Sequence, residues 1–313
     1  MIFSAPTVFA QSEMLKSVVN NLALYKQKKD LKYLTSAKKS VDSLIVTHKD
    51  SQNLEKNVYR AVVYSSIIYA DSTNKLNNPP KFFDQTTLLV DRLSADKKIY
   101  RYQSEIDFAK HCLANVFIHR GFEYINKLDY RNGIIQFKRA QQYAPDFKQI
   151  NAYIAYCNSK TGSLQEAVKY YDNLLKTDST KAEYYETASN IYKSLGDTTK
   201  ALETLKRGRR NLPNDHFLLM DLANIYNNNR DYQSLEPLLP TLLDNNTTNA
   251  DVTFVAANCY DHLGQYGKAE SLYLQAIELN SSLYDPVYNL GVLYLRETEE
   301  TKGDESTKNW SRA

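Results

Sequence analysis

The residue types that most often carry out chemistry in proteins are few and scattered in this chain of 313 residues. Its three cysteines, Cys112, Cys157 and Cys259, form no Cys-x-x-Cys pair, and no histidine lies at metal-ligand spacing from any of them. Zinc ligands usually come as such closely spaced pairs. The sequence therefore predicts no metal site.

The histidines and carboxylates form no recognisable catalytic motif. The five histidines are His48, His111, His119, His216 and His262. None of them stands beside a nucleophile motif, and the chain has neither a glycine-rich phosphate loop nor His-Glu-x-x-His. Glu183 and Glu186 are a pair of carboxylates one helical turn apart, on a face that we expect to be solvated. We therefore predict a protein that is not an enzyme and needs no cofactor; a hydrolase or transferase is the less favoured alternative.

One dense basic run stands out, Lys206-Arg207-Gly208-Arg209-Arg210. It falls at the predicted C-terminal end of a helix, where cations complement the helix dipole. An acidic partner or a membrane surface is the functional alternative. The net charge is only +3, and one run is too little for nucleic acid, which is not a predicted partner. No stretch approaches the roughly 18 apolar residues of a membrane span.

The elements that position these side chains are predicted to be helices. With 42% hydrophobic and 24% charged residues, the chain has the composition of an ordinary globular protein. Its 9 glycines and 8 prolines are too few for the many tight turns of an all-β fold. The 25 tyrosines, against one tryptophan, need a repeated structural role.

A repeat of 34 residues supplies that role. Small residues recur at one position in Gly121, Ala155, Ser189, Ala223, Ala257 and Gly291, and twelve residues later in Gly133, Ala167, Ala201 and Ala269, with Leu235 in the fourth repeat. Three residues after the first position come Tyr124, Asn158, Tyr192, Tyr226, Tyr260 and Tyr294. Gly162, Gly196 and Gly264 mark a turn between two helices.

In period, small-residue positions and tyrosine positions together, residues 114–296 resemble the tetratricopeptide repeat family, as five full repeats and helix A of a sixth. The resemblance implies an all-α fold, a right-handed superhelical solenoid of stacked helix pairs that share one core. Small residues let helices A and B approach closely, and tyrosines fill the grooves beside them. Cys157 and Cys259 occupy the same apolar repeat position, so we expect core residues too far apart for a disulfide.

Two regions depart from the pattern. In the fourth repeat, Pro237 and Pro240 predict a short or kinked helix B at about 234–244. Residues 12–113 are also helical but irregular, with amphipathic stripes over 31–45 and 58–69, a loop at 77–80 and a helix over 82–93. A long helix at about 99–126 is expected to join this region to the regular array as one continuous solenoid.

The resemblance also implies where a partner binds. In the family, helix A lines the inner, concave face, and its fifth and ninth repeat positions supply the candidate binding residues Phe122, Tyr156, Asn190, Asn224, Asn258, Met220, Phe254 and Tyr288. The three asparagines in register resemble the asparagine ladders that grip peptide backbone, since an amide both donates and accepts. The alternative is that they are ordinary solvent-facing residues. The family's clamp for a terminal carboxylate needs Lys or Arg at these positions, and none is present.

Both ends of the chain carry predictions. Residues 2–10 are a short apolar run that ends in Val8-Phe9-Ala10, so residues 1–11 are interpreted as the remnant of a signal peptide, or else as an apolar N-terminus of a cytoplasmic protein. Helix A of the sixth repeat, Tyr284 to Arg296, is apolar all round. The polar tail, 297–313, holds one large apolar residue, Trp310, and is predicted to be disordered, leaving an uncapped end for self-association.

Together these patterns predict a scaffold without catalytic activity that binds a protein segment in its groove, located in the periplasm or cell envelope. A cytoplasmic co-chaperone or assembly adaptor with the same fold is the first alternative. An upstream basic segment before residue 1 would separate the two.

Overall fold

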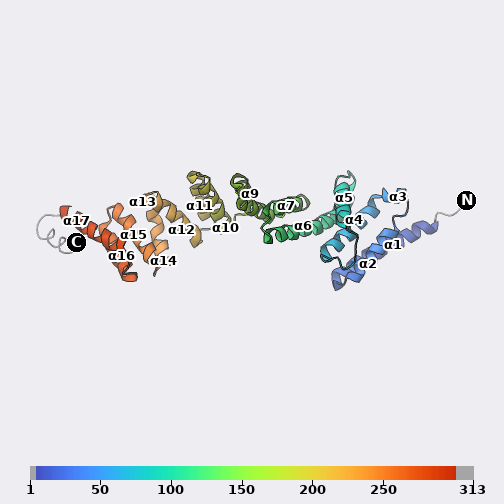
Figure 1. The fold of residues 1–313 in the computed structure, drawn as a ribbon, viewed down its shortest axis with the longest axis horizontal. Helices are drawn as coiled ribbons and strands as arrows, with labels where there is room; N and C mark the ends of the chain where they lie inside the picture. The colour runs from blue at the N-terminus through green and yellow to red at the C-terminus, as the bar shows by residue number, and fades with distance from the viewer. Residues whose placement is uncertain (1–4, 301–313) are drawn as a thin grey trace. The chain divides into compact units, whose positions relative to one another are not determined.

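The computed structural model describes the backbone of residues 5–300 and the side chains of residues 13–296, and this part of the chain contains helices, turns and loops but no strand (Figure 1). The all-α fold is thereby confirmed. The chain divides into two compact units, residues 1–170 and 171–313. Their boundary lies inside helix α9 (Leu164–Thr177), well after residue 113, where the irregular region was expected to end. Between residues 5 and 300, no helix is long and apolar enough to cross a membrane.

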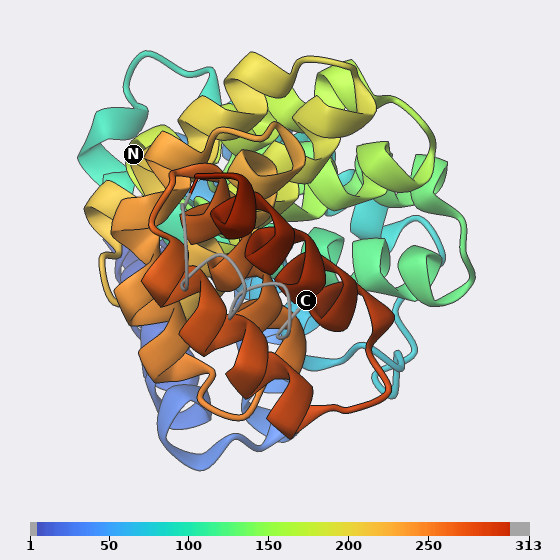
Figure 2. The ribbon, with the colours of Figure 1, turned by 90° about the vertical axis from the view of Figure 1, so that its left-hand side faces the viewer.

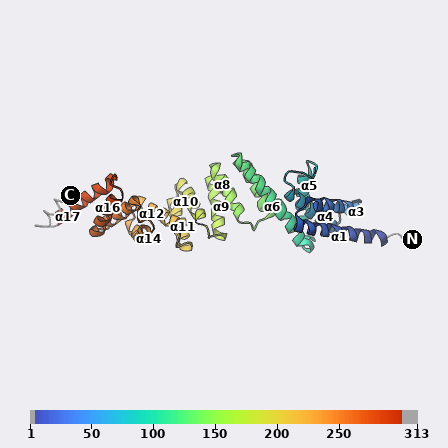
Figure 3. The ribbon, with the colours of Figure 1, turned by 90° about the horizontal axis from the view of Figure 1, so that it is seen from below.

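The first unit contains the irregular helices and the first regular pairs (Figures 1 and 3). Its helices are α1 (Ala5–Lys28), α2 (Leu31–Ser43), α3 (His48–Ser51), α4 (Leu54–Ala70), α5 (Phe82–Ser94), the 3₁₀ helix η1 (Ile99–Tyr102), α6 (Gln103–Asn126), α7 (Tyr130–Tyr143) and α8 (Gln149–Lys160). The predicted stripes are α2 and α4, and the predicted long helix is η1 followed by α6. Residues 1–11, which were interpreted as the remnant of a signal peptide, overlap α1, because this helix begins at Ala5. Residues 1–4 lie outside the described residues.

The second unit, residues 171–313, contains the remaining helix pairs (Figure 2). After the end of α9 come α10 (Ala182–Ser194), α11 (Thr198–Asn211), α12 (His216–Asn228), α13 (Tyr232–Leu235), the 3₁₀ helix η2 (Glu236–Leu238), α14 (Leu239–Asn245), α15 (Ala250–His262), α16 (Tyr266–Leu279) and α17 (Tyr284–Glu300). Helices α10 and α11 pack as one pair and α15 and α16 as another, as the stacked-pair fold requires.

The small residues lie where helices A and B cross, which confirms the phase of the repeat. Ala155, Ala167, Ala257 and Ala269 are fully buried. In the third repeat the Ser189 hydroxyl donates to the carbonyl oxygen of Ala201 at 3.1 Å. Backbones approach this closely only where side chains are small.

The turn between helices A and B has one conformation in every repeat. Gly162, Gly196 and Gly264 have φ of +76°, +77° and +73°, and Leu128 and Arg230, at the same repeat position, have φ of 59° and 54°. The next residue caps helix B, because Asp129, Asp197 and Asp231 each accept a backbone N–H hydrogen bond from the third residue after them. Glycine spacing alone does not reveal the two non-glycine turns.

The fourth helix B is broken, as its prolines predict. It consists of α13, η2 and α14, with Pro237 in the 3₁₀ turn and Pro240 in the first turn of α14. A proline has no N–H to donate and its ring crowds the preceding turn, so the helix restarts at each one. Leu235, which replaces the usual small residue, is nevertheless fully buried.

The C-terminal helix is longer than predicted. We expected it to end at Arg296, but α17 continues to Glu300, so placing residues 297–300 in a disordered tail was wrong. No glycine or proline follows Arg296 before Gly303, and a polar sequence without such breakers extends a helix already begun. The remaining tail, including Trp310, lies outside the described residues.

Candidate functional site

The three asparagines of the predicted ladder lie on successive A helices of the second unit, namely α10, α12 and α15. Asn190 and Asn224 are exposed and Asn258 is half-buried. The Asn190 side-chain oxygen accepts from the Lys193 ammonium at 3.4 Å, a long contact that water or a ligand can replace. The side chains are therefore available to a partner; their role in binding stays a prediction.

The predicted aromatic and apolar residues differ in exposure. In the first unit, Phe122 is 38% and Tyr156 39% exposed, although the Phe122 ring also packs edge-on against Tyr153 at 4.8 Å. In the second unit, Tyr288 is 57% exposed, whereas Met220 and Phe254 are half-buried. Aromatic side chains that remain partly in water are common at recognition surfaces.

The exposed face of α17 is apolar, as the sequence predicts. Tyr284, Val287 and Tyr288 are all at least half exposed, and the two tyrosine rings stack at 5.7 Å. The opposite side of this helix, including Leu290 and Leu293, is buried. Coverage of the exposed face by a second copy of the chain stays a prediction.

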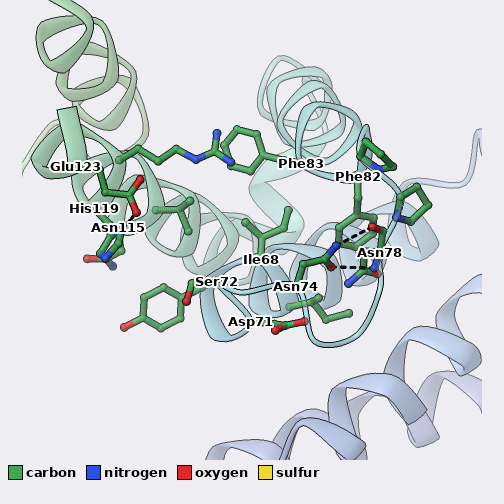
Figure 4. A pocket seen from close by; sticks show the side chains of 16 residues that line it. Ile68, Asp71, Ser72, Asn74, Asn78, Phe82, Phe83, Asn115, His119 and Glu123 are labelled. Atoms are coloured by element: carbon green, nitrogen blue, oxygen red, sulfur yellow. Dashed lines mark hydrogen bonds and ion pairs between the residues drawn. The ribbon is translucent and has the colours of Figure 1, made fainter. Parts of the chain in front are cut away.

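A pocket in the first unit, which we call the α4–α6 pocket, was not predicted (Figure 4). It has a volume of about 610 Å³. It lies between the C-terminal end of α4, the loop before α5, and α6. Its lining is Ile67, Ile68, Tyr69, Asp71, Ser72, Asn74, Asn78, Pro79, Pro80, Phe82, Phe83, Asn115, Val116, His119, Arg120 and Glu123. The sequence predicts the helices and the 77–80 loop that surround it, but not that they enclose a pocket.

Two polar side chains hold the pocket's loop in shape. The Asp71 carboxylate accepts backbone N–H hydrogen bonds from Lys75 at 2.7 Å and Leu76 at 2.8 Å. The Asn74 amide bonds both backbone groups of Asn78, at 3.0 and 2.8 Å (Figure 4). These bonds show that Asp71 and Asn74 hold the loop in the shape that forms the pocket wall.

The groups left to face a ligand come mainly from α6. The Arg120 guanidinium lies over the Phe83 ring, 3.6 Å from its centre, in a cation–π contact. His119 lies 3.4 Å from Glu123. An ordered cation beside aliphatic and aromatic side chains suits recognition, and the pocket contains no cysteine and no serine beside a base.

The carboxylate pair considered for acid–base chemistry lies on helix α10. Glu183 is exposed and Glu186 is half-buried. Burial raises the pKa of Glu186, and the carboxylates of Asp221, Asp215 and Glu183 raise it further. These four groups form an acidic surface, which we call the acidic A face. Among the described residues, no group of three His, Cys, Asp or Glu side chains is placed to hold a metal ion.

The three cysteines are buried free thiols. Burial raises the pKa of Cys112 to about 12 and those of Cys157 and Cys259 to about 11. At neutral pH they are therefore protonated, and the thiolate is the reactive form.

We expect iodoacetamide at pH 7.5 to modify the three cysteines of the folded chain far more slowly than those of the chain in urea, measured by intact mass. Rapid alkylation of any cysteine in the folded chain would show that this thiol is a reactive site.

Comparison with known proteins supports the repeat assignment. Residues 182–208 and 250–283 match the family model of the tetratricopeptide repeat. Similar solved structures include YrrB, described as a TPR protein with an unusual peptide-binding site (12% identity, 56% of this chain and 91% of that one, TM-score 0.46). A tetratricopeptide repeat protein from Parabacteroides merdae has 18% identity (64% and 78%, TM-score 0.46), and MamA from Desulfovibrio magneticus has 16% (53% and 92%, TM-score 0.42).

No curated protein sequence matches the chain. The two matched segments coincide with α10–α11 and α15–α16, whose helices pack in pairs around buried small residues at the predicted 34-residue period. These two segments are therefore tetratricopeptide repeats, set in an all-α fold of stacked helix pairs.

Proposed function

We propose that this chain is a scaffold without catalytic activity, which binds a segment of another protein along the A helices of its second unit. One observation carries the proposal. Asn190, Asn224 and Asn258 occupy the same position of three successive A helices and keep their amides at least partly in solvent. Amides meet a peptide backbone equally well as donors and acceptors, so they bind extended chain whatever its side chains.

The spacing of the helices suits an extended ligand. Packed helices lie about 8–10 Å apart, and an extended peptide advances about 3.3 Å per residue. A bound segment would therefore need about three residues for each step between helices that pack directly, as α10 and α12 do. The acidic A face adds a preference, because Glu186 and Asp221 favour a segment with lysine or arginine. A cation there would relieve the carboxylate repulsion that raises the pKa of Glu186.

The test begins with peptides selected from a phage-displayed random library on the full-length chain. Replacing Asn190, Asn224 and Asn258 together with alanine is expected to weaken the selected peptide by about 1 kcal/mol for each lost hydrogen bond, measured by calorimetry. The melting temperature should change little, because two of the three side chains are exposed.

A matched control replaces three exposed amides on B helices, Asn173, Asn245 and Gln275, with alanine. The control should keep the parent affinity. Equal affinity of the ladder variant and the parent would contradict binding by the three asparagines. Selected peptides that are not enriched in lysine or arginine would contradict the preference assigned to the acidic A face.

An envelope location is part of the proposal and rests on the apolar run ending in Val8-Phe9-Ala10. Fractionation of cells expressing the complete gene would test it. Recovery in the cytoplasm would favour the adaptor alternative and would leave peptide binding untouched.

A further inference from the structure

A cavity in the second unit is lined mainly by the B helices α9 and α11, and we call it the basic pocket. Its volume is about 570 Å³. It is formed by the end of α9, by α10 and by α11, and its lining is Asp172, Lys176, Tyr192, Lys200, Glu203, Thr204, Lys206, Arg207 and Arg210. Five cations thus face two carboxylates in one cavity. None of the ladder asparagines lines it.

Of the five cations, Lys200 alone forms an ion pair within the described residues. The Asp172 carboxylate is engaged by the Tyr192 hydroxyl, which donates to it at 2.6 Å. Lys200 pairs with Asp197 at 3.0 Å. Within the described residues, no carboxylate forms an ion pair with the remaining cations, which are Lys176, Lys206, Arg207 and Arg210.

Arg207 lines the pocket with its guanidinium, which lies 5.7 Å from the Tyr185 ring. Its Nε is buried, so a ligand in the pocket would bind through the terminal nitrogens of the guanidinium. A guanidinium binds the two oxygens of a carboxylate especially well.

Stabilisation of the helix end does not explain this arrangement. Arg209 does serve the end of α11, because its guanidinium donates to the backbone oxygens of Pro213 and Asp215. Lys176 in the last turn of α9 and Arg210 in the last turn of α11 also complement a helix dipole. Lys206 and Arg207 lie earlier in α11, yet both line the pocket. A helix-dipole effect falls off within the last turn and does not account for these two.

The distribution of the charges indicates the size of the ligand. The four cations without an ion pair in the described part of the chain come from two helices, Lys176 from α9 and the other three from α11, around a cavity of about 570 Å³. A single phosphate is much smaller than this cavity, whereas a short peptide segment is of the size that such pockets hold. We propose that the basic pocket binds an acidic segment of a protein, whose Asp and Glu side chains pair with Lys176, Lys206, Arg207 and Arg210.

This second surface is independent of the ladder, so each proposal can fail alone. The probe is a fluorescein-labelled glutamate-rich peptide, with binding to the full-length chain followed by anisotropy at low and high salt. The double variant Lys206→Glu, Arg210→Glu is expected to bind at least tenfold more weakly. Arg207→Gln should lose several-fold. Raising the salt should weaken the parent complex strongly.

The control is the double variant Lys181→Glu, Lys268→Glu, which makes the same change in net charge outside the pocket. It should bind the probe like the parent, and all variants should keep the affinity of the ladder-binding peptide. An equal loss of peptide affinity in the control would show that net charge alone causes the effect, and it would overturn the proposal. So would binding of inorganic phosphate in place of the peptide at equal affinity, or binding of phosphatidylserine vesicles without binding of the peptide.

Discussion

Replacing Gly121 with alanine is expected to destabilise the chain by about 3 kcal/mol. Gly121 lies in α6 directly against Phe137 of α7, and an added Cβ would meet three atoms of that ring at 2.5 to 2.8 Å. Phe137 is fully buried, so its ring has no free space to enter. The clash outweighs the roughly 1 kcal/mol that alanine gains over glycine within a helix. Urea unfolding followed by circular dichroism measures the difference.

Gly133 provides the matched control. It is also buried in a helix at the same crossing. The atom of another helix nearest to an added Cβ would be the Gly121 carbonyl oxygen at 3.5 Å, which is ordinary van der Waals contact. Gly133→Ala should therefore be neutral or slightly stabilising. Phe137→Leu should partly rescue Gly121→Ala, because the smaller side chain opens the space that the methyl group needs. Similar stability of the two alanine variants would show that the helices do not cross as described.

Replacing Arg296 with methionine is expected to cost about 3 kcal/mol and to loosen α17. Arg296 donates to the Asp261 carboxylate at 2.7 Å, and the Tyr273 hydroxyl donates to the other oxygen of that carboxylate at 3.2 Å. Asp261 is only 7% exposed. Without Arg296, its buried carboxylate would keep the Tyr273 hydroxyl but lose its cation. Hydrogen exchange should show the loss of protection in α15 and α17.

A second Arg–Asp–Tyr cluster, in the first unit, serves as the control. Arg139 and Tyr143 bond Asp91 at 3.0 and 2.7 Å, but both charged side chains are more than a third exposed. Arg139→Met should therefore cost no more than about 1 kcal/mol. Adding Asp261→Asn to Arg296→Met should recover stability by removing the buried charge. Equal costs at Arg139 and Arg296 would contradict the role that we assign to burial.

Several features of the fold could be read directly from residue spacing. The 34-residue period places Ala167, Ala201 and Ala269 at the helix crossings, where all three are fully buried. The glycines at 162, 196 and 264 take the left-handed turn conformation. Pro237 and Pro240 break the fourth helix B. These features depend on local backbone preferences and on periodic burial, which a short stretch of sequence already contains.

The candidate surfaces were only partly predictable. The ladder asparagines could be placed because they share a repeat position. The α4–α6 pocket could not, since it joins Arg120 of α6 to Phe83 of α5 in the region where the repeat is irregular. The basic run suggested a charged surface, but the sequence does not show that Lys176 of α9 shares its cavity.

The sequence by itself therefore determined the helix pairs, their crossings and the position of the amide ladder. The tertiary structure decided which charges share a cavity, which arginine anchors the last helix, and how Leu128 and Arg230 take a turn that favours glycine. The physical reason is distance along the chain. Asp261 and Arg296 meet across two helices, and such a contact depends on the rotation and offset of packed helices, which periodicity does not specify.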